Sequence, residues 1–246
     1  MANTDYKSPD ALMRHLRDNG ISISGSSQKQ QLINTGYFHG YKGYRFFVSS
    51  SNRLPFTSYN EINATIQYDT KLKSLLYGKM MFIETALKNI ALNTIMSEID
   101  SSSIYDMYDK AISSYKNAPA GTREDIKKKY QNNKLNLQGS IQNAIAHNDV
   151  VYDTRFKKMD SSRPMKQCLI LEMGMPYINF KTIGDYIILI CYYLKLLKVS
   201  KTEIKSFIRE FEKITREYES SVNPNVSAIS IHPDLFSRLN ILKNSI

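Results

Sequence analysis

The feature that most constrains the fold of this chain is an apolar stripe of helical period between residues 58 and 99. Apolar side chains recur there at intervals of three or four residues, at Leu72, Leu76, Met80, Ile83, Leu87 and Ile90. Such spacing places them on one face of an α-helix, because a strand would need alternation at every second residue. Ser58 and Glu61 have the spacing of a capping box, which predicts where the helix begins. The stripe therefore predicts one long helix that packs against other helices.

Caps and stripes of the same kind predict helices along most of the chain. Ser8 followed by Pro9 begins the first helix and Gly20 ends it, while Ser200 and Glu203 form a second capping box. Further helices are expected at about 28–34, 104–115, 122–130, 134–147, 183–198 and 202–220, and a short strand at 168–171. The predicted fold is an all-α helical bundle, with a small N-terminal helical lobe at residues 1–56 and a larger helical domain at residues 57–246.

The charge balance favours a polyanionic partner. Lysine and arginine outnumber aspartate and glutamate by 33 to 23, so the net charge is +10 and the pI is near 9.4. Nucleic acid is the simplest partner of such a chain. The alternative is a solvated basic surface without a partner of this kind.

Several classes of protein fit the composition poorly. Cys168 and Cys191 lie outside any known motif, which argues against a disulfide framework and against a cysteine zinc site. The N-terminal residues lack the basic and then apolar pattern of a signal segment. The most apolar run, residues 183–197, carries Asp185 and Lys195 and is too short to span a bilayer. We expect a cytoplasmic protein with no membrane partner, no metal and no cofactor.

The candidate catalytic residues are Gln142, Asn143 and His147, near the end of the helix expected at 134–147. At 3.6 residues per turn, Asn143 and His147 share one helical face and Gln142 lies beside them. An imidazole has an ordinary pKa near 6.5, which suits it to proton transfer. The alternative is that His147 only caps helix carbonyls or fills a surface position.

The nine residues from Ile141 to Asp149 resemble the signature of HEPN ribonucleases. That signature is an arginine, then a polar residue that is usually asparagine, then three residues and a histidine. Asn143 and His147 match it, whereas Gln142 stands where the arginine should be.

A second resemblance supports the first one. Paired residues recur in a fixed order along the chain: Tyr37-Phe38, Gly43-Tyr44-Arg45, Phe46-Phe47, Tyr68-Asp69, Leu72-Lys73 and Ile83-Glu84. This order resembles the AbiD/AbiF group of bacterial abortive-infection proteins, which carries its HEPN motif where His147 lies here. The matching residues run from about Leu32 to Asn89, and no counterpart can be matched after Asn179.

The resemblance implies a phage-defence protein that acts on RNA as a homodimer, because HEPN motifs usually meet across a two-fold interface. It also implies cleavage without a metal, in which the ribose 2′-hydroxyl attacks the neighbouring phosphorus. His147 would transfer protons and Asn143 would orient the phosphate or the histidine. Gln142 donates hydrogen bonds but brings no charge, and losing one preorganised donor costs on the order of 10²–10³ in rate. The chain is therefore expected to be either an impaired endoribonuclease or a non-catalytic RNA-binding module that forms a ribonucleoprotein with a structured non-coding RNA.

Basic and aromatic residues on both sides of the motif are candidates for RNA binding. Phosphates would be neutralised by Lys127, Lys128 and Lys129 before the motif and by Arg155, Lys157, Lys158, Arg163 and Lys166 after it. Tyr152 would stack on bases. The alternative for residues 127–129 is a solvated helix face. A DNA-binding helix-turn-helix at residues 8–34 is a third interpretation, and the few basic residues in that span count against it.

Overall fold

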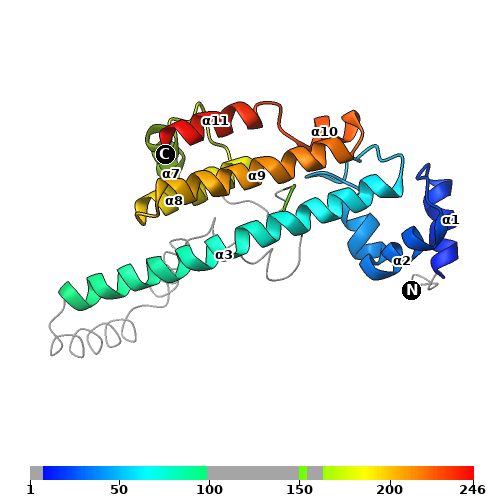
Figure 1. The fold of residues 1–246 in the computed structure, drawn as a ribbon, viewed down its shortest axis with the longest axis horizontal. Helices are drawn as coiled ribbons and strands as arrows, with labels where there is room; N and C mark the ends of the chain where they lie inside the picture. The colour runs from blue at the N-terminus through cyan, green and yellow to red at the C-terminus, as the bar shows by residue number, and fades with distance from the viewer. Residues whose placement is uncertain (1–7, 99–149, 154–162) are drawn as a thin grey trace, which may run out of the picture.

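The computed structural model describes residues 8–98, 150–153 and 163–246 (Figure 1). Within these ranges the regular structure is helical, and the strand-like pairings are two isolated bridges, Ser22 with Ser58 and Phe46 with Arg53. The prediction of an all-α fold is confirmed. The helices expected at 104–115, 122–130 and 134–147 lie outside the described residues. The division of the chain at residue 56 stays a prediction.

Three short helices form the N-terminal part: α1 (Pro9–Asp18), α2 (Gly25–Thr35) and the π-helix η1 (Tyr37–Lys42). The predicted N-cap is confirmed, because Ser8 Oγ accepts a hydrogen bond from Ala11 N at 3.3 Å. Gly36 ends α2 with a φ of 72°, which only glycine adopts at little cost. Both α2 and η1 pack against α3.

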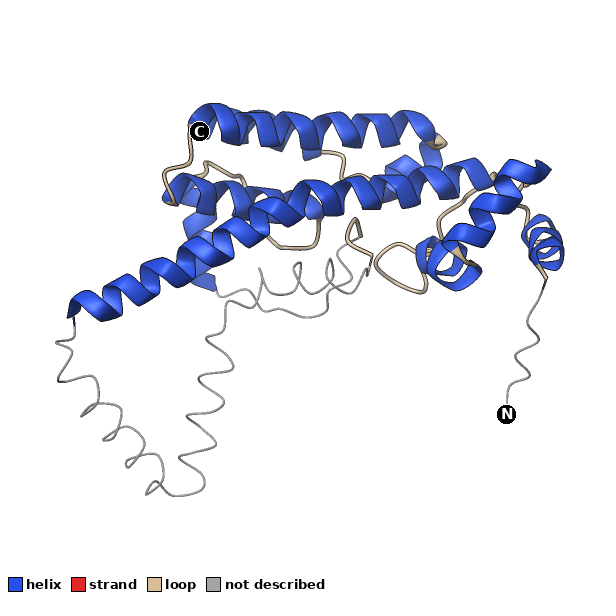
Figure 2. Cartoon of the chain, turned by 60° about the horizontal axis from the view of Figure 1, so that its bottom comes forward, coloured by secondary structure: helices blue, strands red, loops and turns tan. Residues whose placement is uncertain are grey.

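The long helix α3 (Tyr59–Glu98) has 40 residues and is therefore about 60 Å long. Its capping box is confirmed, because Glu61 N donates to Ser58 Oγ at 3.4 Å and Ser58 N donates to Glu61 Oε2 at 3.1 Å. The apolar stripe is buried as far as Ile83, whereas Ile90 is 52% exposed. The C-terminal end of α3 extends past the ends of the described helices that pack beside it (Figures 1 and 2).

The C-terminal helices pack around a buried centre. Helix α8 (Ile183–Leu196) is apolar on nearly all sides and contacts α3, α7 (Arg163–Glu172), α9 (Lys201–Ser221) and α11 (Leu235–Ser245). Helix α9 runs antiparallel beside α3 (Figure 1). Its apolar face follows the predicted pattern, with Ile204, Phe207, Ile208, Phe211 and Ile214 buried. In the ranges that the structure describes, none of the helices combines the length and apolarity needed to cross a membrane.

Two details of this region differ from the sequence expectation. The strand expected at 168–171 is wrong, because these residues belong to α7; a short apolar run has no periodicity that separates strand from helix. The sequence interpretation also missed α10 (Pro224–Ser230) and α11. A signal for α10 was present, since Asn223 caps it and Pro224 occupies its first position.

Ion pairs join α3 to α9 at two places along their contact. Lys71 Nζ lies 2.7 Å from Glu217 Oε2, and Lys79 Nζ lies 2.5 Å from Glu203 Oε1. The second pair explains why the capping box of α9 is half formed. Ser200 Oγ accepts from Glu203 N at 3.2 Å, while the Glu203 carboxylate pairs with Lys79.

Candidate functional site

The structure describes only a small part of the predicted site. Gln142, Asn143 and His147 lie outside the described residues. So do six of the predicted RNA-binding cations, which are Lys127, Lys128, Lys129, Arg155, Lys157 and Lys158. Arg163 is the first residue of α7 and Lys166 is half-buried on the same helix. Tyr152 belongs to residues 150–153, which we call the post-motif segment because it begins three residues after His147.

The post-motif segment is held by a buried carboxylate on α3. Asp69 Oδ1 accepts hydrogen bonds from the backbone amides of Val151 and Tyr152, both at 2.7 Å. Asp69 Oδ2 accepts from Tyr44 Oη at 2.8 Å and lies 2.9 Å from Lys73 Nζ. Asp69 and the four residues that it binds are called the Asp69 cluster below.

The partners of Asp69 compensate for its burial. Its side chain is fully buried, and an unpaired buried carboxylate would cost several kcal/mol. Hydrogen bonds to a charged group contribute about 1.5–3 kcal/mol each, so losing the post-motif segment would remove two of the four contacts that compensate for this burial. With both oxygens occupied and no exposed surface, Asp69 is suited to positioning the chain and not to contact with a substrate.

The cluster joins three pieces that are far apart in the sequence. Tyr44 comes just after η1, Asp69 and Lys73 lie on α3, and Val151 and Tyr152 follow the motif. Sequence reasoning quoted Tyr44, Asp69 and Lys73 in its resemblance but gave them no role. A signal was available, because Asp69 lies three residues before Leu72, on the apolar face of α3, where a charged residue needs a partner.

Tyr152 is buried inside an aromatic cluster. Its ring centroid lies 5.9 Å from that of Tyr44, 5.5 Å from Phe47, 6.2 Å from Tyr68 and 6.4 Å from Tyr218. Only 1% of Tyr152 is exposed. The prediction that Tyr152 stacks on bases is therefore wrong for this structure, because rings of the protein occupy its surroundings and no face is open to a base.

The aromatic cluster around Tyr152 extends to α9 through a ring contact and a hydrogen bond between hydroxyl groups. The rings of Tyr68 and Tyr218 stack with centroids 4.4 Å apart, and Tyr68 Oη lies 3.0 Å from Thr215 Oγ1. Burial raises the pKa of both phenols above its ordinary value of 10, so they stay neutral hydrogen-bonding groups. A cavity of about 70 Å³ beside Tyr68 and Tyr152 has room for about two water molecules, and so none for a nucleotide.

Asp153 fixes the post-motif segment to the N-terminal part. Its Oδ2 accepts a hydrogen bond from Val48 N at 3.3 Å, and the residue is buried. Val48 has a φ of 61°, which is rare for a β-branched residue and carries strain. The strained turn is thus held in place by the residue that lies six positions after His147.

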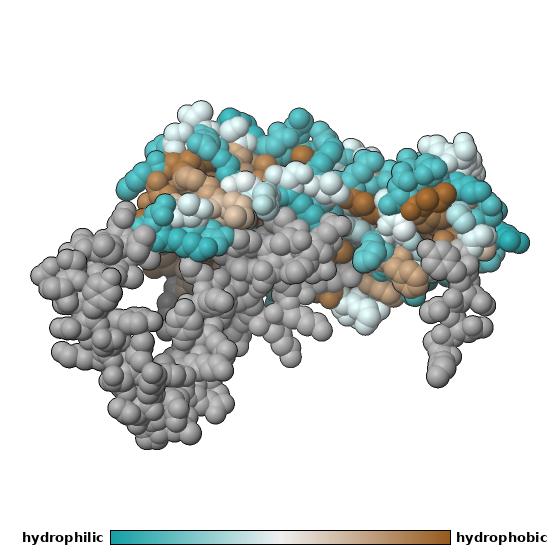
Figure 3. All heavy atoms as spheres, turned by 90° about the horizontal axis from the view of Figure 1, so that it is seen from below, coloured by the Kyte–Doolittle hydropathy of each residue, from teal (hydrophilic) through white to brown (hydrophobic). Residues whose placement is uncertain are grey.

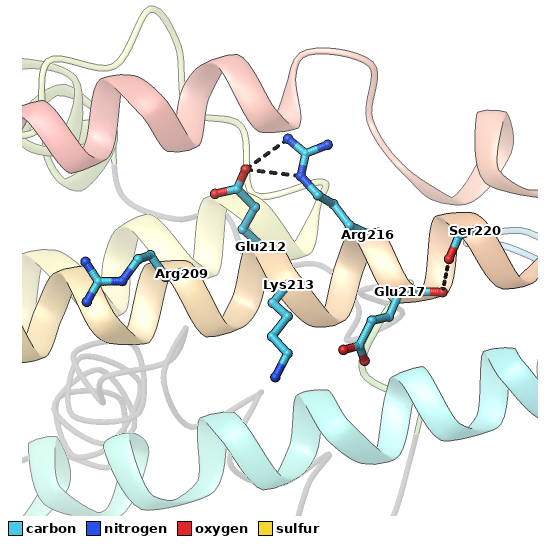
Figure 4. A pocket seen from close by; sticks show the side chains of 6 residues that line it. All are labelled: Arg209, Glu212, Lys213, Arg216, Glu217 and Ser220. Atoms are coloured by element: carbon cyan, nitrogen blue, oxygen red, sulfur yellow. Dashed lines mark hydrogen bonds and ion pairs between the residues drawn. The ribbon is translucent and has the colours of Figure 1, made fainter.

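Helix α9 carries a shallow depression on its surface. It is lined by side chains of one helix, Arg209, Glu212, Lys213, Arg216, Glu217 and Ser220 (Figure 4). Glu212 binds Arg216 at 2.9 Å and also Lys243, while Glu217 pairs with Lys71. Since most of these charges are paired within the protein, the depression offers little net field for a ligand. Within the described ranges, no three His, Cys, Asp or Glu side chains are grouped as metal ligands.

The comparison with known protein families identifies the family of this chain. The family model described as Abi-like protein matches residues 30–164, which is more than half of the chain. The matched range contains the whole Asp69 cluster and the three motif residues, whereas α8, α9, α10 and α11 lie after it. Curated proteins and solved structures gave no match. The chain therefore belongs to the family of Abi-like proteins, which points to a role in phage defence.

Proposed function

We propose that this Abi-like protein acts on RNA in the bacterial cytoplasm as a HEPN-type, metal-independent endoribonuclease of the AbiD/AbiF type. Gln142, Asn143 and His147 would form its site, and two copies of the site would meet in a homodimer. One observation carries the proposal. The segment that begins three residues after His147 is bound, through two backbone amides, by the buried Asp69 of the family-matched range.

The chemistry follows from the residue types. Attack by the ribose 2′-hydroxyl on phosphorus needs one proton removed and another delivered to the leaving oxygen, and an imidazole performs both steps near neutral pH. Negative charge develops on the phosphorane oxygens, which an arginine would stabilise with two parallel charged hydrogen bonds. Gln142 supplies only neutral hydrogen bonds, so cleavage by this chain is expected to be slow.

Gln142 also favours a second function, that of a non-catalytic RNA-binding module. Without a cation at position 142 the site retains groups that hold RNA but lacks the charge that speeds cleavage, which suits a non-catalytic module bound to a structured non-coding RNA. Phosphate contacts in either case would come from the cations at positions 127–129, 155, 157, 158, 163 and 166.

Substitution at position 142 tests the catalytic proposal. Gln142→Arg is expected to raise RNA cleavage by at least about 10²-fold, because it returns the charge that stabilises the phosphorane. The products should carry cyclic phosphate ends, and a chelator should not reduce the rate. The double change Gln142→Arg with His147→Ala is the matched control and should be inactive, since proton transfer is lost.

Each outcome of this experiment has a definite meaning. Activity that survives in the double variant would show that the site lies elsewhere. An inactive single variant that still co-purifies with one discrete RNA would favour the ribonucleoprotein. A chain that remains monomeric in sedimentation at all concentrations would overturn the paired site.

A further inference from the structure

A second cluster of charges and rings lies on the N-terminal part, outside the residues assigned above. Between Asp18 and Glu61 the sequence has no acidic residue but four basic ones, of which Lys29 pairs with Asp10 at 2.8 Å. The other three are Lys42, Arg45 and Arg53. Within the described ranges none of these three has an ion pair with a carboxylate.

These three cations are interleaved with aromatic rings. Lys42 Nζ lies 4.7 Å from the ring centroid of Phe38, and Arg45 Cζ lies 4.6 Å from that of Phe46 and 6.0 Å from that of Tyr41. Arg53 Nη2 lies 3.4 Å from Tyr41 Oη. Cation–ring contacts of this kind occur about once per 70–80 residues, so their density here is unusual. We call this set the aromatic–cationic strip: Phe38, Tyr41, Lys42, Arg45, Phe46 and Arg53.

Phe38, Lys42 and Arg53 are the exposed members of the strip, whereas Arg45 and Phe46 are half-buried and Tyr41 is buried. In η1, Phe38 and Lys42 are four residues apart and share a face, and Gly40 lets this turn pack against α2, because a Cβ there would lie 3.0 Å from Thr35 Oγ1. Phe38 is 67% exposed, and Lys42 and Arg53 are exposed as well. Arg45 and Arg53 lie on the two arms of one turn, since Leu54 N donates to Arg45 O at 2.9 Å.

Arg45 has donor capacity that the described part of the protein does not use. Its Nε is buried and has no hydrogen-bond partner there, although its guanidinium packs on two rings. Two cation–ring contacts on the C-terminal helices differ in this respect. Arg216 and Arg238 are each bound by a carboxylate, that of Glu212 and that of Asp185.

We infer that the aromatic–cationic strip binds single-stranded RNA, with unpaired bases stacked at Phe38 and phosphates bound by Lys42, Arg45 and Arg53. Rings supply stacking surfaces for any base, and unpaired cations bind the backbone between the bases. The inference deepens the proposed function and rests on it, because it takes RNA as the polyanion. The strip would hold the strand near the post-motif segment, since Val48, two residues after Phe46, is bound by Asp153 of that segment.

An anionic membrane surface is the main competing partner. A peripheral membrane site needs a continuous apolar face that enters the lipid. Here each ring lies beside a cation, and the turn that carries Arg45 and Arg53 has exposed Ser49, Ser50, Ser51 and Asn52 at its tip. Apolar and hydrophilic side chains are mixed on the face of the N-terminal part seen in Figure 3. These features favour RNA.

Binding of the full-length chain to a labelled, single-stranded 2′-O-methyl oligoribonucleotide of mixed sequence tests the inference. This probe lacks the attacking hydroxyl, so fluorescence anisotropy reports binding without cleavage. Phe38→Ala is expected to weaken binding about 5-fold or more, with the same salt dependence, because stacking releases no counterions. Lys42→Gln is expected to lower the slope of log K against log salt by about 0.7, because one phosphate contact is lost.

Two controls keep the test specific. Phe82→Ala removes another exposed phenylalanine, 46% exposed on α3, and should leave binding unchanged. Phe38→Tyr keeps the ring and should bind like the unaltered chain. Since Phe38 is mostly exposed, the thermal unfolding midpoint of both Phe38 variants should stay unchanged.

The outcomes separate this inference from the proposed function. Unaltered binding by Phe38→Ala and Lys42→Gln, together with loss of binding in Lys157→Ala and Lys158→Ala, would overturn the strip and leave the proposed function standing. Binding of anionic vesicles in place of RNA would overturn the strip as well. A chain that binds no RNA at all would overturn both.

Discussion

Two buried aspartates, Asp69 and Asp185, each bind a loop to a helix, and their partners differ. Asp69 lies in the family-matched range and binds the backbone amides of Val151 and Tyr152. Asp185 lies in the first turn of α8, after that range, and accepts from Phe180 N at 2.8 Å while it pairs with Arg238 of α11. Both carboxylates are fully buried and both close a loop onto a helix.

The difference lies in where the cation comes from. Lys73 lies one turn after Asp69 on α3 and is partly exposed, whereas Arg238 comes from another helix, is buried and also donates to Tyr177 O at 3.1 Å. Removing Arg238 would leave a charge enclosed by the core, while water can still reach Lys73. Asp185 therefore holds the C-terminal bundle together, and Asp69 holds one segment in position.

Arg238→Ala is expected to have the largest effect on stability. It leaves the Asp185 carboxylate buried without its cation, which costs about 3–5 kcal/mol in the free energy of unfolding. Urea unfolding followed by circular dichroism measures the loss.

The matched control adds Asp185→Asn to the same chain. An asparagine still accepts from Phe180 N but carries no charge, so part of the stability should return. A double variant as unstable as the sum of both single changes would show that the two residues act independently.

Asp69→Asn is expected to cost less, about 1.5–3 kcal/mol, because it weakens charged hydrogen bonds beside a partly exposed cation. The loss should be local. Hydrogen exchange at the amides of Val151 and Tyr152 should speed up, while exchange in α8 stays slow. In the Gln142→Arg background, cleavage should fall by up to about 10²-fold, because a small misplacement of the motif is enough.

Tyr44→Phe refines the same comparison. It removes one hydrogen bond to Asp69 and should cost about 1.5 kcal/mol, the low end for a bond to a charged group, because the two amides and Lys73 still compensate the carboxylate. Equal exchange rates in α8 and in the post-motif segment of the Asp69→Asn variant would contradict the view that Asp69 acts locally.

Glu61 of α3 accepts hydrogen bonds from Asn223, the N-cap of α10, and so joins the N-terminal part to the C-terminal helices. Replacing Glu61 is expected to have the smallest effect on stability, and only at acidic pH. Desolvation raises its pKa, but hydrogen bonds from Thr57 N, from the Asn223 side chain and from Ser58 N outweigh this and hold the pKa below its ordinary 4.5. A group with a lowered folded pKa stabilises the protein above its unfolded pKa, and the contribution is lost as pH falls through the folded value.

The thermal unfolding midpoint should therefore drop as the pH falls below about 4.5, and Glu61→Gln should flatten that part of the curve. An equally steep curve in the variant would assign the acid sensitivity to other carboxylates.

Local rules account for the helices that were predicted correctly. The caps at Ser8 and Ser58, the stripe on α3 as far as Ile83 and the face of α9 depend on residues within a few turns of one another. Ile90 matches the same stripe but is exposed, because burial needs a partner helix that the periodicity does not reveal.

The environment of Tyr152 was decided by partners far away in the sequence. Its residue type suits stacking on bases and stacking in a core equally well. Tyr44, Tyr68 and Tyr218 come from three separate parts of the chain, and only their arrangement around Tyr152 excludes a base.

The sequence by itself determined the helical class, the family-specific order of residues and the absence of acidic residues between Asp18 and Glu61. These properties depend on residue type and spacing along one chain. The tertiary structure decided that Asp69 binds the post-motif segment and that three cations contact rings of the N-terminal part, of which Phe38 is exposed. Both depend on which groups from distant parts of the sequence come into contact. A buried charge is stable only beside partners, and a ring is exposed only where no other part of the chain packs over it.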